Sequence, residues 1–305
     1  MIDVGLMIEG QMGVTWPRWQ RIARAAEAAG YDGLYRSDHF TEPRGPHQEA
    51  LELWTSLTWV ADNTSRLSFG PMVAPVSFRD PRIMAWQAAA IHALAPGRLR
   101  LGLGAGWNER EHEEFGFDLL GIDARFRRFT EALEVVTRLV RQEGPVSFSG
   151  EFYELDGAEF VPNPVRFGTL PIVVGGNGPR RTLPLAARFA DEWNGVSLTP
   201  DAFRERTALL DDLLREEGRN PADVKRTLMT RVIFGSDADQ LEERLHGETA
   251  DELRAAGRIV GTAEQIREQL RELEAAGVQG VMLQWLDGLD DIPGIEALGR
   301  AASVR

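Results

Sequence analysis

An aspartate and a histidine stand next to each other where a short apolar segment ends. The segment is Gly33–Arg36, and Ser37, Asp38, His39 and Phe40 follow it. A histidine titrates near neutral pH and can move a proton or donate a hydrogen bond, and a neighbouring aspartate can orient it or contact a ligand. The alternative is structural: Asp38 caps the following turn and His39 packs beneath it. His39 is the first candidate for catalysis.

A glycine-rich turn further along the chain has the composition of an anion site. It consists of Gly175, Gly176, Asn177 and Gly178, followed by Pro179, Arg180 and Arg181. Backbone N–H groups at the start of a helix attract phosphate, and Arg180 or Arg181 would complete the site. Arginines at a helix start oppose the helix dipole unless an anion is near. The alternative is a plain turn between a strand and a helix. In either case Pro179 is expected at the first position of that helix.

The segment 101–109 reads Leu-Gly-Leu-Gly-Ala-Gly-Trp-Asn-Glu. It superficially resembles a dinucleotide fingerprint, but the last glycine of that motif is missing, so a Rossmann site is rejected. Gly104 and Gly106 would still allow a flat ligand to approach the backbone. Asn108 and Glu109 would then lie at the mouth of the site. For Glu109, a solvated helix start is favoured over catalysis.

The segment 67–73 carries Gly70 and Pro71 inside an apolar run. Both residues are unusual within a regular buried strand, so a bulge or an irregular peptide is expected there. Such a kink could form a platform for a ligand. The alternative is an ordinary strand end followed by a turn at Pro75.

The elements that must position these residues are indicated by the apolar pattern, in which short strand-like segments alternate with longer segments of helical period, as in repeated βα units. Eight strands are expected, at Asp3–Ile8, Gly33–Arg36, Leu67–Val73, Arg98–Leu103, Pro171–Val174, Glu192–Val196, Thr227–Phe234 and Val278–Trp285. Helix starts are indicated at Asp80, Thr199 and Thr262. Without a Ser/Gly-rich linker, the pattern favours one (β/α)8 TIM barrel domain over residues 1–305, with its site at the ends of strands one to five. A doubly wound open sheet is the alternative.

Two segments do not fit this alternation of strands and helices. Residues 144–168 predict a hairpin insertion before the fifth strand, and residues 237–256 predict a charged helical insertion between the seventh and eighth strands. Insertions that follow the carboxyl ends of barrel strands shape the mouth of the active site.

Composition excludes several classes of protein. The 305 residues include no cysteine, which removes disulfides, cysteine-ligated metals and thiol nucleophiles, and none of the five histidines forms a metal-binding motif. The net charge of −13 argues against nucleic acid and anionic membranes as partners. The N-terminus lacks a signal peptide pattern, and no apolar run is long enough to span a membrane, so a cytoplasmic protein is expected.

In their order and spacing, these segments resemble the luciferase-like monooxygenase superfamily, flavin and deazaflavin enzymes on a TIM barrel. The matching blocks are Ser37–Phe40, Phe78–Pro81, Pro96–Arg98, Leu101–Trp107, Ser149–Tyr153, Pro171–Gly178, Ala187–Asn194 and Val260–Thr262. The Ser-Asp-His-Phe and Gly-Ala-Gly-Trp blocks are more similar to the branch that uses coenzyme F420, a 5-deazaflavin. The resemblance covers nearly the whole chain.

The resemblance implies specific roles. Asp38 and His39 would lie against the deazaflavin ring, and the Met72-Val73 bond would match a non-proline cis peptide behind it. Asn108 would contact the cofactor, and residues 175–178 would bind its phosphate. Glu9, after the first strand, matches a family position only loosely and is a further catalytic candidate.

The implied reaction is hydride transfer, not oxygenation, between coenzyme F420 and an unidentified small organic substrate, with His39 handling the accompanying proton. One alternative is an FMN-dependent monooxygenase supplied with reduced flavin by a partner reductase. Another is a non-catalytic barrel that only binds cofactor. The family implies a homodimer.

Overall fold

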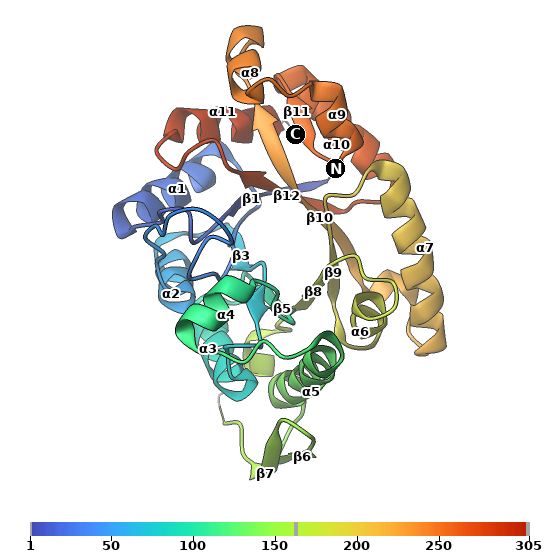
Figure 1. The fold of residues 1–305 in the computed structure, drawn as a ribbon. Coiled ribbons are helices and arrows are strands. Elements are labelled where there is room, and N and C mark those ends of the chain that lie inside the picture. The colour runs from blue at the N-terminus through green and yellow to red at the C-terminus, as the bar shows by residue number, and fades with distance from the viewer. Residues whose placement is uncertain (1, 162–163, 303–305) are drawn as a thin grey trace.

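The chain forms a barrel of parallel strands surrounded by helices (Figure 1). The computed structural model describes residues 2–161 and 164–302. The barrel strands are β1 (Asp3–Ile8), β2 (Gly33–Arg36), β3 (Ser68–Pro71), β4 (Ala74–Pro75), β5 (Leu101–Gly104), β8 (Ile172–Gly175), β9 (Glu192–Val196), β10 (Lys225–Phe234) and β12 (Gly280–Trp285). They pair in the order β3-β2-β1-β12-β10-β9-β8-β5-β4.

The two ends of this path meet, which closes the sheet. A parallel bridge joins Phe69 of β3 to Leu99, just before β5. β3 and β4 occupy one strand position, since only residues 72 and 73 separate them. The predicted TIM barrel is therefore confirmed, and the open doubly wound sheet is wrong.

The irregular peptide expected in this third strand position is also present. The peptide bond between Met72 and Val73 is cis, as the family resemblance implied. It lies between β3, which pairs with β2, and β4, which pairs with β5.

The helices surround the sheet and begin where the sequence signals indicated. They are α1 (Trp16–Ala29), α2 (Leu53–Asn63), α3 (Pro81–Leu94), α4 (Glu109–Phe115), α5 (Ile122–Arg141), α6 (Thr182–Phe189), α7 (Pro200–Glu216), α10 (Ala263–Ala275) and α11 (Ile292–Ala302). Asp80 and Thr199 accept backbone N–H groups as the N-caps of α3 and α7, and Thr262 forms a capping box with Gln265. One start was predicted wrongly: α6 begins at Thr182, and Pro179 lies in the preceding turn.

Both insertions are present. The first holds the antiparallel hairpin of β6 (Val146–Ser149) and β7 (Glu154–Ala158), and the second holds α8 (Ala238–Leu245) and α9 (Ala250–Ala255). A short strand that sequence reasoning missed, β11 (Ile259–Gly261), pairs with the end of β10. In Figure 1 the hairpin projects from the bottom of the ring and α8 from its top.

An apolar cluster fills the middle of the barrel and leaves its carboxyl end open for a site. It consists of Met7, Tyr35, Met72, Val173 and Met282, with Val73 and Met229 packed against it. No helix among the described residues is long and apolar enough to cross a membrane, and within the same ranges no group of three or more acidic or histidine side chains could hold a metal ion.

Candidate active site

A cavity of about 760 Å³ lies at the carboxyl ends of the barrel strands. Its lining comes from the ends of strands around the whole ring, including β9, β10 and β12, and from the start of α5, which is wider than the predicted five strands. Eight predicted site residues line it, namely Glu9, His39, Met72, Val73, Gly104, Gly106, Gly175 and Gly176. No described residue of either insertion does, so the prediction that the insertions shape the mouth is wrong.

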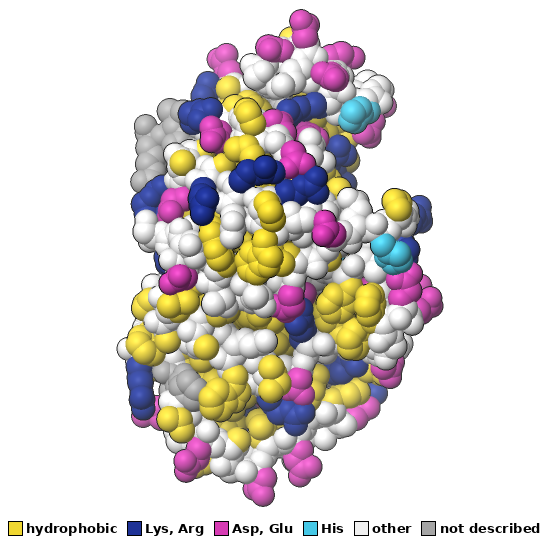
Figure 2. Space-filling view, turned by 90° about the vertical axis from the view of Figure 1, so that its left-hand side faces the viewer, with side chains coloured by type: hydrophobic (Ala, Val, Ile, Leu, Met, Phe, Trp, Pro, Cys, Tyr) yellow, Lys and Arg dark blue, Asp and Glu magenta, His cyan; other side chains and the backbone are white. Residues whose placement is uncertain are grey.

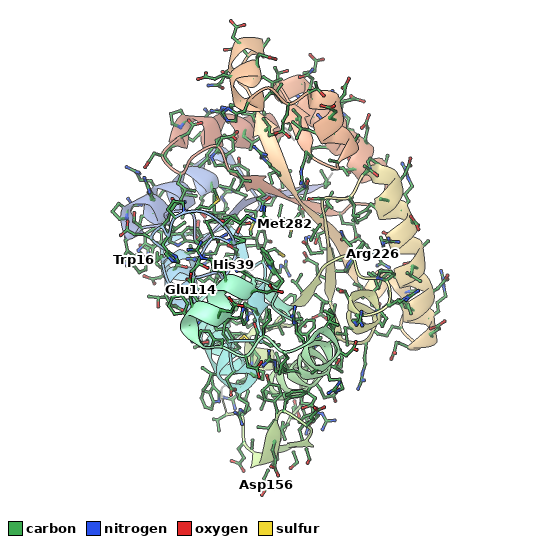
Figure 3. The ribbon with its side chains drawn as sticks, viewed as in Figure 1. Trp16, His39, Glu114, Asp156, Arg226 and Met282 are labelled. Atoms are coloured by element: carbon green, nitrogen blue, oxygen red, sulfur yellow. The ribbon has the colours of Figure 1, made fainter. Side chains whose placement is uncertain are left out.

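His39 is held at the wall of this cavity by a buried glutamate. Its Nδ1 atom lies 2.8 Å from Oε1 of Glu111, and the side chains are 13% and 1% exposed. Because a carboxylate only accepts, Nδ1 carries the hydrogen, and Nε2 is the nitrogen that can exchange a proton with a bound molecule. The ring of Trp107 meets His39 edge-on at 5.3 Å. In Figure 3 the labelled His39 lies beside α4, which carries Glu111.

The environment tunes this histidine toward its protonated form. Burial alone would lower the pKa of His39, but the hydrogen bond and charge of Glu111 outweigh it, with smaller contributions from Glu9 and Asp38. The pKa of His39 therefore lies above its ordinary value. A histidine so placed can serve as a proton donor or acceptor near neutral pH.

Glu111 was missed by sequence reasoning, which considered Glu109 in the same run. Glu109 is exposed at the first position of α4, so the favoured interpretation as a solvated helix start is confirmed. Glu111 is fully buried, and its Oε2 accepts the backbone N–H of Phe40. Phe115, one helical turn after Glu111, packs on Phe40 at 5.2 Å and so holds α4 against the segment that carries His39, a tertiary contact that the sequence alone does not show.

Asp38 does not line the cavity. Its buried carboxylate accepts two hydrogen bonds from Arg79, at 2.9 and 2.8 Å, and Arg79 also pairs with Glu52. Burial would lower the pKa of Arg79, but Asp38 raises it above its usual range. Asp38 thus anchors the chain next to His39, and this position does not suit the cofactor contact that the resemblance implied.

The glycines of the cavity wall serve the protein's own packing. A Cβ atom on Gly104 would come within 2.4 Å of the Val73 side chain, and one on Gly106 within 2.2 Å of Ser77 Oγ. A Cβ on Gly175 would lie 3.2 Å from Val73. Gly106 also has a φ of +86°. These contacts give the glycines a packing role: Gly104 and Gly175 make room for Val73, and Gly106 for Ser77. The expectation that Gly104 and Gly106 admit a flat ligand stays a prediction, and both residues line the cavity.

The turn between β8 and α6 is built around the side chain of Asn177. That amide donates to the carbonyl of Val196 at 2.7 Å and accepts its N–H at 2.8 Å, so Asn177 joins two strand ends and does not line the cavity. Gly176, at φ +121°, lines the cavity, whereas Gly178 does not. Arg180 is exposed, also outside the cavity lining.

Asn108 lies deeper than expected. It is 2% exposed, and its side-chain amide donates to the carbonyl of Thr41 at 3.0 Å. Its own carbonyl is 2.7 Å from Nδ1 of His112. Asn108 therefore ties the start of α4 to the loop after β2 and does not line the cavity, so the structure lends no support to its predicted cofactor contact.

Arg125 was missed as a site residue. Among the described residues that line the cavity, it is the one lysine or arginine. Its guanidinium donates to the carbonyls of Leu119, Leu120 and Gly106 at 3.1, 2.9 and 3.3 Å. The signal was an arginine close to the start of a helix, the same signal that pointed to Arg180.

Two carboxylates lie on the other side of the cavity. Glu9 accepts hydrogen bonds from Gln284 and Gln11. Glu42 is a second carboxylate that sequence reasoning missed: its Oε1 is buried and has no hydrogen-bond partner among the described residues. Burial and the charge of Glu9 raise the pKa of Glu42 above its ordinary value.

Other proteins resemble this chain in sequence. A model of the luciferase-like monooxygenase family matches residues 4–255. A protein named F420-dependent glucose-6-phosphate dehydrogenase, from Kineococcus radiotolerans, is 32% identical over 221 residues, which span 72% of this chain but only 64% of that protein. An F420-dependent hydroxymycolic acid dehydrogenase from Mycobacterium tuberculosis is 27% identical over 275 residues, or 90% of this chain and 72% of that protein.

Solved structures share the whole fold. An F420-dependent secondary alcohol dehydrogenase in complex with an F420-acetone adduct superposes with a TM-score of 0.85 at 19% identity, covering 99% of both chains. A long-chain alkane monooxygenase superposes with a TM-score of 0.79 at 16% identity, covering 98% of this chain and 90% of that one. At these identities the two structures establish the fold alone.

Proposed function

Because the chain belongs to the luciferase-like monooxygenase family, we propose that it is an oxidoreductase that exchanges hydride between coenzyme F420 and a small organic substrate. Curated relatives named as F420-dependent dehydrogenases support this choice of cofactor. The observation that carries the proposal is His39, which Glu111 holds at the wall of a large cavity.

The cavity fits a flat anionic cofactor. Its volume of about 760 Å³ lies within the ordinary range for cofactor sites. Met72 and Val73 supply an apolar wall against which a ring system can lie, and Arg125 supplies a fixed positive charge for a phosphate. We assign the cofactor phosphate to the end of the cavity that holds Arg125, Gly176 and Thr182.

The proposed chemistry needs few protein groups. When bound, F420 supplies a ring carbon that accepts or donates a hydride. In the oxidation of an alcohol, Nε2 of His39 would accept the hydroxyl proton, and the hydride from the carbinol carbon would pass to the cofactor; reduction of a carbonyl would reverse both transfers. Glu111 is a positioning residue, because it holds the ring and stabilises the protonated histidine.

FMN is the alternative cofactor, since the neighbouring folds include monooxygenases, and it would require a partner reductase. Titrating the purified protein with F420 and with FMN, and following the fluorescence of each, compares their dissociation constants directly. We expect the tighter binding for F420. Tight FMN binding without F420 binding would overturn the proposal, as would F420 binding without turnover of any alcohol or carbonyl compound.

Replacing Arg125 by glutamine should weaken F420 binding. The variant removes the positive charge that we assign to the cofactor phosphate, and a hydrogen bond to a charged group contributes about 1.5 to 3 kcal/mol, or roughly 10- to 100-fold in affinity. Arg127→Gln is the matched control, because Arg127 is on the same helix but pairs with exposed Glu151. A fluorescence titration measures both. Equal affinity of the two variants would contradict the assignment.

A homodimer is the assembly we propose. The outer face of helices α2 and α3, with Trp16 of α1, forms an apolar groove, and Figure 2 shows hydrophobic side chains gathered on this side of the molecule. Leu94 is 47% exposed and Trp16 is 36% exposed there. A two-fold interface of two such faces buries the same apolar surface on each copy.

Placing a charge on this face should prevent dimerisation. Leu94→Glu would bury a carboxylate in the interface, which is costly without a partner. Light scattering coupled to size-exclusion chromatography is expected to give twice the chain mass for the wild type and for Val161→Glu, a control on a different exposed apolar side chain. It is expected to give one chain mass for Leu94→Glu. A monomeric wild type would contradict the assembly.

A further inference from the structure

The cavity has opposite charges at its two ends. Glu9 follows β1, and Gln284, which hydrogen-bonds to Glu9, belongs to the adjacent strand β12. In the closed ring, β8 stands four strand positions from β1 in either direction, and β5 stands equally far from β12. The turn after β8 and Gly106, the partner of Arg125, therefore lie across the barrel from Glu9.

We propose that the substrate of this enzyme is uncharged, an alcohol or carbonyl compound with apolar substituents, and that phosphorylated and carboxylated substrates are rejected. The inference rests on the proposed function, since it takes the Arg125 end for the cofactor phosphate. What remains for the substrate is the opposite end, where Glu9 and Glu42 line the wall. His39 also lines the cavity, in position to exchange the proton of a bound alcohol.

The side chains of this end match an uncharged molecule. Its apolar lining comes from Met12, Pro43 and Leu286. The buried Oε1 atom of Glu42, which has no partner among the described residues, is available for one hydrogen bond with a substrate hydroxyl or carbonyl. A carboxylate accepts from a hydroxyl and a carboxylic acid donates to a carbonyl, so either form of Glu42 recognises an uncharged oxygen.

An anionic substrate would meet two like charges there. Glu9 and Glu42 both line the cavity, and neither has an arginine or lysine among its hydrogen-bond or ion-pair partners in the described parts of the chain. Buried Arg36 acts on Glu9 electrostatically but does not line the cavity, and protonated His39 offsets one of the two carboxylate charges. Arg231, which is opposite Gln284 in the sheet register, does not line the cavity, and its charge acts on Asp287. We therefore do not expect this chain to use glucose 6-phosphate, the substrate in the name of the Kineococcus relative.

Matched substrate pairs test the proposal. Methyl lactate and lactate present the same secondary alcohol without and with a negative charge, and glucose and glucose 6-phosphate do the same for a sugar. With F420-loaded protein, we expect kcat/KM for the neutral member of a pair to exceed that of the anion by at least about tenfold, the effect of roughly 1.4 kcal/mol of like-charge repulsion. Calorimetric titration of the apoprotein with methyl pyruvate and with pyruvate measures the same preference without turnover.

Variants that remove one carboxylate charge test whether Glu9 and Glu42 cause the preference for an uncharged substrate. Glu9→Gln and Glu42→Gln are each expected to reduce the preference for the neutral member, whereas Glu113→Gln, which removes an exposed charge from α4, should leave it unchanged. The inference is overturned if an anion is preferred, if no neutral member binds, or if the preference is the same in all variants. Loss of the proposed function is a separate result, because it appears as failure of the protein to bind F420.

Discussion

Replacing His39 by alanine is expected to lower turnover by about 10² to 10⁴ while weakening F420 binding by no more than about tenfold. General acid or base catalysis contributes the first factor, whereas one lost neutral hydrogen bond costs only about 1 kcal/mol of binding. His39 combines the required features, since it lines the cavity and has its second nitrogen held by Glu111. Steady-state kinetics and a cofactor fluorescence titration measure the two effects separately.

His47→Ala is the control for this variant. His47 is exposed and pairs with Glu114 at 3.4 Å, outside the cavity lining. Wild-type turnover in His39→Ala would make His39 a packing residue. A large loss of F420 binding with normal turnover at saturation would instead make it a ligand of the cofactor.

Replacing Glu111 by glutamine should move the pH dependence of turnover to lower pH. The charge and hydrogen bond of Glu111 hold the pKa of His39 above its ordinary value, so an uncharged amide lets that pKa fall. Alcohol oxidation needs neutral His39 and rises with pH through this pKa, whereas carbonyl reduction needs the protonated form and falls. In both directions of the reaction, the pH at which turnover is half of its maximum is therefore lower in the variant than in the wild type.

The same variant should also turn over more slowly. A carboxylate-to-amide change behind the catalytic histidine of serine proteases costs about 10⁴ in turnover. A loss of the same order, about 10² to 10⁴, is expected here, because the amide has one acceptor oxygen for two donors, Nδ1–H of His39 and the backbone N–H of Phe40, and its NH2 group must face one of them. Glu113→Gln, on the same helix, is the control. An unchanged pH profile in Glu111→Gln would show that Glu111 does not tune His39.

The barrel could be predicted from sequence because its signals are local. Strand and helix periodicity, with caps such as Asp80 and Thr262, follow from neighbouring residues. The start of α6 was misplaced because Pro179 fits a first helical position equally well as a turn. β11 is only three residues long and exists through its pairing with the end of β10, which a local pattern does not contain.

The site was predicted only in part, because the missing information is tertiary. His39 and the Met72-Val73 peptide were found from motifs in the chain. Glu111 was missed because its role depends on a contact with His39, 72 residues away. Arg125 was missed for a similar reason. Hydrogen bonds to the carbonyls of Gly106 and Leu119 hold its guanidinium at the cavity, and the sequence pattern does not show these contacts.

The packing around Val73 has a consequence for how this site can change. Gly104 and Gly175 come from the neighbouring strands β5 and β8, and a Cβ on either would approach the side chain of Val73 within 3.2 Å and no other atom as closely. Substitutions at these three positions are therefore epistatic: a larger residue at either glycine is tolerated only when residue 73 becomes smaller. A library that varies the three positions together should yield functional combinations that three single-site libraries cannot contain.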